Sequence, residues 1–83
     1  MSLAEERLQL KGRLLEAEQK KRELEIRIGA LKRTIRADAD PYREPDAADA
    51  LALADSAKLH LEAVSAWTEC VALVERLKRD LGE

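Results

Sequence analysis

The residues best suited to chemistry lie in one short segment, 60–70, with the sequence HLEAVSAWTEC. It holds the only histidine, the only tryptophan and the only cysteine of the chain, which are His60, Trp67 and Cys70. A metal centre needs three or four convergent ligands, and His60 and Cys70 supply two. On a helix, ten residues separate them by about 15 Å, which is also too far for a Cys–His nucleophile pair. We therefore interpret the segment as helix packing, with no catalytic residue and no metal site.

The remaining polar residues form no recognisable catalytic pattern. Carboxylates are numerous, but none lies in an apolar sequence context suited to acid–base catalysis. The sequence also lacks a glycine-rich phosphate loop. We therefore expect neither enzymatic activity nor a bound cofactor.

Basic residues in the first half of the chain are the second candidate site. Three of them are spaced by eleven residues, about three helical turns, which would align them in a stripe that could follow a phosphate backbone, and two more broaden it near the hairpin tip. The stripe comprises Lys11, Arg22, Lys32, Arg33 and Arg36. A net charge of −2, a pI near 5.5 and interleaved glutamates argue against this interpretation. Nucleic acid is therefore the alternative partner. Leu8, Leu15 and Ile26 lie on the same side, as scattered surface residues or as a patch for a further protein partner.

Composition predicts an all-α protein of one domain, 1–83. Charged residues make up 39% of the 83 residues and aromatics only 2%, while leucine and alanine supply most of the apolar content. Such a composition with helical spacing is typical of long helices and coiled coils. No apolar run approaches the roughly 18 residues of a membrane span, and a lone cysteine fits a reducing compartment. We expect a cytoplasmic protein with no membrane partner.

The hydrophobic pattern predicts two helices of matched length, joined as an antiparallel hairpin. We expect helices over about 3–37 and 46–81, with Ser2 and Asp46 as N-caps and Gly82 as a C-terminal cap. Pro41 and Pro45 interrupt the chain in a loop of about 38–45. In the first helix, apolar residues follow a heptad stripe that Arg7 and Lys21 interrupt. The stripe consists of Leu3, Leu10, Leu14, Ala17, Leu24, Ile28, Leu31 and Ile35.

The second helix carries more apolar surface than one neighbouring helix can cover. One apolar line runs through Leu53, Ala57, His60, Val64, Trp67, Val71 and Val74. A second line runs through Leu59, Ala63, Ala66, Cys70, Leu73 and Leu77. A helix that is apolar around most of its circumference is expected to be buried from more than one direction. We expect the second line, together with Trp67, to pair two copies into a homodimeric four-helix bundle with the second helices central.

Charge and shape together indicate an assembly role. Residues 1–37 carry ten Lys/Arg against six Asp/Glu, and residues 38–83 carry five against eleven. A basic helix beside an acidic one favours this pairing over pairing of like helices. The sequence is therefore expected to encode a non-enzymatic protein–protein interaction or assembly module that acts as a helical homodimer. Such roles are common among small accessory proteins, including those encoded by phages. A nucleic-acid-associated regulator that uses the basic stripe is the alternative.

Overall fold

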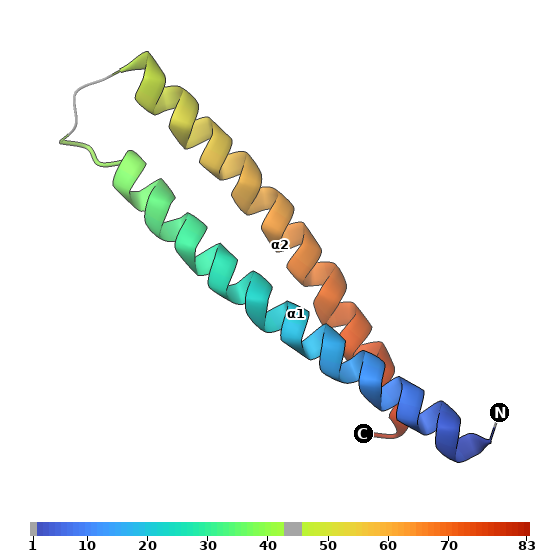
Figure 1. Ribbon diagram of the computed structural model, residues 1–83. Coiled ribbons are helices and arrows are strands. Elements are labelled where there is room, and N and C mark those ends of the chain that lie inside the picture. Colours follow the sequence, from blue (N-terminus) through green and yellow to red (C-terminus); the bar gives the residue numbers. More distant parts are fainter. Residues whose placement is uncertain (1, 43–45) are drawn as a thin grey trace.

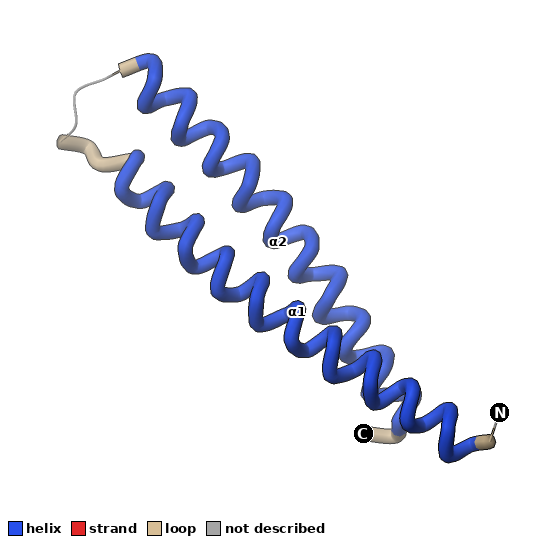
Figure 2. The backbone as a smooth tube through the Cα atoms, in the orientation of Figure 1, coloured by secondary structure: helices blue, strands red, loops and turns tan. Residues whose placement is uncertain are grey.

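Two long helices lie side by side and antiparallel (Figures 1 and 2). The computed structural model describes residues 2–42 and 46–83, and in these ranges it contains α1, Leu3–Asp38, and α2, Ala47–Leu81, with no strand. Measured over Cα atoms, the molecule is 64 Å long and 14 Å wide. The predicted all-α hairpin is confirmed. Of the two prolines that predict its interruption, Pro41 follows α1 and Pro45 lies outside the described residues.

Local hydrogen bonds explain where the helices begin and end. The Ser2 hydroxyl accepts a bond from the Glu5 amide at 3.2 Å, and a carboxylate oxygen of Asp46 accepts one from the Ala48 amide at 2.8 Å. Both bonds satisfy amides that the first helical turn leaves without a partner. Gly82 ends α2 with φ 77°, a left-handed conformation that residues with a Cβ rarely adopt.

The apolar stripe of α1 faces α2, as its heptad spacing predicts, except at its first residue. Leu14 and Ala17 are buried, and the later members are half-buried. Leu3 is 80% exposed because α1 extends past the end of α2 (Figure 1). Near that end, the Arg7 guanidinium donates a hydrogen bond to the carbonyl oxygen of Leu81 at 3.3 Å. This charged residue within the stripe therefore binds the C-terminus of α2, where the helix dipole favours a cation.

The core lies in the half of the hairpin near the chain ends. Its packed cluster comprises Leu14, Ala17, Val74, Leu77 and Leu81, with Leu10 and Leu73 against it. In the half near the loop, no residue from 18 to 38 of α1 and none from 47 to 62 of α2 is buried. The partly buried residues of α2 in this half are Asp49, Leu53, Ser56 and His60, of which only Leu53 is a large aliphatic side chain. The hairpin is consequently well packed at one end and sparsely packed at the other.

Candidate functional site

The segment that holds His60, Trp67 and Cys70 lies along the face of α2 that contacts α1. Cys70 is only 5% exposed, and its thiol donates to the carbonyl oxygen of Ala17 at 3.1 Å. Trp67 is half-buried, and its indole nitrogen donates to a carboxylate oxygen of Glu25 at 3.3 Å. Both side chains therefore bridge the two helices. Cys70 behaves as a small buried residue with a weak hydrogen bond, which suits packing better than reactivity.

His60 is the one member of this segment whose polar group lacks a partner. The side chain is half-buried, and its Nε2 atom is covered without a hydrogen bond to any described residue. A buried nitrogen without a hydrogen bond lowers the free energy of unfolding, so His60 makes the contact between α1 and α2 less stable at its position along the hairpin. Among residues 2–42 and 46–83, no group of three or more histidine, cysteine, aspartate and glutamate side chains is arranged to hold a metal ion.

The residues expected at an oligomer interface fall into two groups. Ala63, Cys70 and Leu77 are buried inside the hairpin, with exposures of 4–5%. Leu59 is 41% exposed, while Ala66, Trp67 and Leu73 are half-buried. Contacts with α1 therefore already bury three members of the line that the sequence is expected to use for pairing two copies.

The physical reason is the period of helix packing. A helical-wheel projection of α2 at 100° per residue separates its apolar residues into two lines. When one helix packs along another, however, the residues in contact recur every seven positions. The face of α2 that meets α1 consequently takes alternate members of both lines. In order, it comprises Leu53, Ser56, His60, Ala63, Trp67, Cys70, Val74, Leu77 and Leu81. The omitted members flank this face, with Ala57, Val64 and Val71 on one side and Leu59, Ala66 and Leu73 on the other.

A groove of about 390 Å³ runs beside Trp67, between the two helices. Val64, Trp67 and Ile28 form its apolar wall, and Glu25 and Lys32 stand at its edge. Gly29 also lines it, and a Cβ built there would meet only the end of the Arg33 side chain, at 3.7 Å. The groove therefore stays open where α1 has no side chain.

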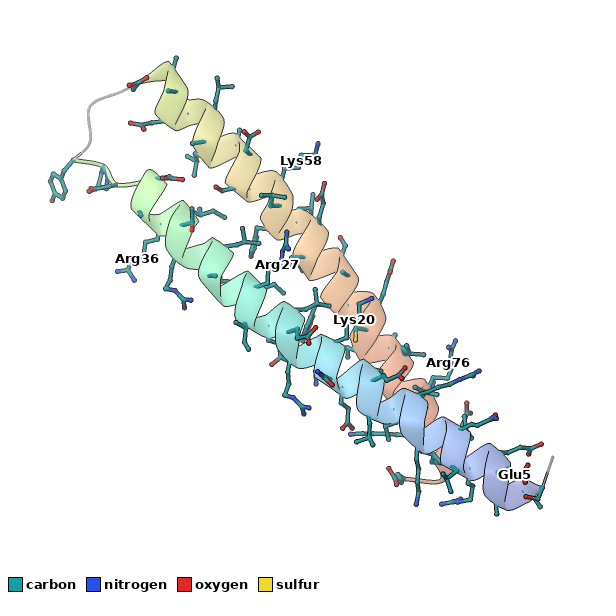
Figure 3. All side chains as sticks on the ribbon, in the orientation of Figure 1. Glu5, Lys20, Arg27, Arg36, Lys58 and Arg76 are labelled. Carbon is teal, nitrogen blue, oxygen red and sulfur yellow. The ribbon has the colours of Figure 1, made fainter. Side chains whose placement is uncertain are left out.

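The basic residues are all exposed on α1, and Lys11, Arg22 and Arg33, at a spacing of eleven residues, lie along one side of it. Lys32 stands at the edge of the groove beside α2, whereas Arg33 and Arg36 line a hollow at the loop end with Asp40. Arg36 points away from α2 (Figure 3). Lys11 and Arg22 are exposed farther along the helix, among glutamates. Lys32 lies about 100° around the helix from Arg33, and glutamates are interleaved with the basic residues in the sequence.

Neither described helix is long and apolar enough to cross a membrane. Comparison of the chain with protein-family models, with curated proteins and with solved structures finds no match.

Proposed function

We propose that this chain is a non-enzymatic assembly module, and that it acts as a homodimer in which two hairpins form a four-helix bundle. The observation that carries the proposal is the apolar surface that α1 leaves uncovered on α2. On the side of α2 that includes Leu61, which is 66% exposed, Ala50, Ala54, Ala57, Val64 and Val71 also lie outside the face that meets α1. Soluble proteins rarely leave such a surface open unless another molecule covers it.

The small core of the single hairpin supports the same proposal. Seven hydrophobic residues among the described residues are buried, and the least exposed of them, Leu81, keeps 3% of its surface exposed. A chain of this size buries too little apolar surface to be very stable without additional packing or a partner. A second hairpin would supply that packing, and a twofold pair is the commonest way for a soluble chain to do so.

Light scattering during gel filtration tests this proposal directly. At tens of micromolar we expect a mass near twice the chain mass of 9.3 kDa. Leu15→Glu is a suitable control because Leu15 is 66% exposed on α1 and should leave the mass unchanged. A helical protein with the mass of one chain would contradict the proposal.

Nucleic-acid binding is the second candidate, because all five residues of the basic stripe are exposed. If the stripe bound nucleic acid, the complex seen as an electrophoretic shift would weaken with salt. For five phosphate contacts, the logarithm of the binding constant plotted against the logarithm of salt concentration would have a slope of about −4 to −5. The double variant Arg22→Glu, Arg33→Glu would abolish that shift. We expect no such shift with mixed DNA and RNA, because glutamates stand between the basic residues. A salt-dependent shift that the double variant loses would favour the second candidate.

A further inference from the structure

An uncharged stripe follows one side of α2, about a quarter-turn from the face that meets α1. Its members recur at steps of three and four residues, which places them on one face of a helix. We call it the lateral stripe, and it comprises Ala50, Ala54, Ala57, Leu61, Val64, Thr68 and Val71. Leu61 at its centre is 66% exposed, and Val64 also lines the groove beside Trp67. The lateral stripe is therefore open and adjoins the groove.

We infer that the lateral stripe pairs with the same stripe of a second copy, antiparallel, with Leu61 beside the twofold axis. The inference rests on the proposed homodimer and identifies the surface that forms it. A twofold interface must be complementary to itself. Three pairs in this register join a small residue of one copy to a larger residue of the other, namely Ala57 with Val64, Ala54 with Thr68 and Ala50 with Val71. Small residues opposite larger ones allow two helices to pack closely without voids.

Thr68 does not introduce an unpaired polar group into this interface. Its hydroxyl donates to the carbonyl oxygen of Val64, on the same helix, at 2.9 Å. Burial of the residue against a second copy would therefore leave its hydroxyl hydrogen bond intact. Because no member of the lateral stripe is charged, pairing would bury no charge within it.

The opposite side of α2 is unsuitable for self-pairing because its apolar residues alternate with acids. This acidic side comprises Asp55, Leu59, Glu62, Ala66, Glu69 and Leu73. Antiparallel pairing about Glu62 would place that carboxylate near its own copy, and Asp55 near Glu69. Like charges in such positions destabilise helix pairs and exclude an otherwise possible register. The charges thus favour the lateral stripe.

The distribution of the core favours the same register. Leu61 lies in the half of the hairpin where α1 and α2 bury little, whereas the packed cluster lies around Leu77. Antiparallel pairing about Leu61 would place residues 50–61 of each α2, from the sparsely packed half, against residues 61–72 of the other copy. A second copy would then cover the part of each hairpin that lacks a core of its own.

Disulfide cross-linking of single-cysteine variants tests the inference. In a Cys70→Ala background, Leu61→Cys should form a linked dimer on mild oxidation about tenfold faster than Leu59→Cys, because two residues beside a twofold axis lie within disulfide range. Leu59 is a matched control, an exposed leucine on the acidic side of the same helix. The register is tested by mixing Ala57→Cys with Val64→Cys, which should cross-link to each other faster than either does to itself.

The possible outcomes distinguish a failure of the lateral-stripe proposal from a failure of the homodimer proposal. Rapid cross-linking at Leu61, with the mixed pair, supports the lateral stripe. Faster cross-linking at Leu59 would overturn it in favour of the acidic side. A dimeric mass without cross-linking at Leu61 would overturn the stripe while leaving the proposed homodimer standing. A monomeric mass for the unmodified chain would overturn the homodimer itself.

Discussion

Leu14→Ala is expected to lower the free energy of unfolding by about 2–5 kcal/mol, because it leaves a cavity in the packed cluster. Leu14 is 7% exposed and packs with residues from both helices, including Val74 and Leu77. A loss of about 3 kcal/mol corresponds to a fall of roughly 10–20 °C in the midpoint of thermal unfolding for a domain of this size. Circular dichroism at 222 nm during heating measures it.

The neighbouring residue provides the control for this prediction. Leu15 occupies the next position of the same helix but is 66% exposed. Leu15→Ala should therefore change the free energy of unfolding by no more than about 0.5 kcal/mol. Equal effects of the two substitutions would show that Leu15 is covered by another molecule. They would also show that the packed cluster contributes less to the free energy of unfolding than we propose.

Dilution is expected to destabilise the protein strongly, because the proposed homodimer gains stability from its second copy. A hundredfold decrease in concentration, from about 100 to about 1 µM, should lower the apparent free energy of unfolding by about 2.7 kcal/mol. The midpoint of thermal unfolding should fall by on the order of 10 °C. Circular dichroism in cells of different path length measures both samples at equal signal.

Leu61→Asp is the matching variant for the dilution experiment. The side chain is 66% exposed in the single hairpin, so a charge there is compatible with the contacts between α1 and α2. Beside the proposed twofold axis, the same charge would oppose its own copy. We expect the variant to unfold at a lower temperature that does not depend on concentration. If the unmodified chain also unfolds independently of concentration, the single hairpin is stable by itself.

The sequence was sufficient to predict the helices because each boundary has a local cause. Ser2 and Asp46 accept the amide bonds expected of N-caps, and Gly82 adopts the left-handed conformation that ends α2. The face that α1 presents was also predictable, since its apolar stripe is narrow and has charged residues on both sides. A helix with one narrow apolar stripe can bury that stripe in only one rotation about its own axis.

The rotation of α2 about its own axis could not be predicted in the same way. Its apolar surface is so wide that several rotations would bury a comparable number of hydrophobic residues. From the sequence, Ala63 and Cys70 are consequently expected at the interface between two copies, whereas contacts with α1 bury them. Three-dimensional packing also revealed the groove beside Trp67, which residues of both helices line.

The position of the core far from the connecting loop has a consequence for folding kinetics. The contacts that tie the packed end together join residues distant in sequence, 74 apart for Arg7 and Leu81 and 53 apart for Cys70 and Ala17. Most of the loop-closure entropy must therefore be lost before substantial apolar burial compensates for it. Such high contact order slows folding relative to helical proteins with local contacts. Zippering outward from the loop gains little apolar burial within one chain, because none of residues 18–38 and 47–62 is buried.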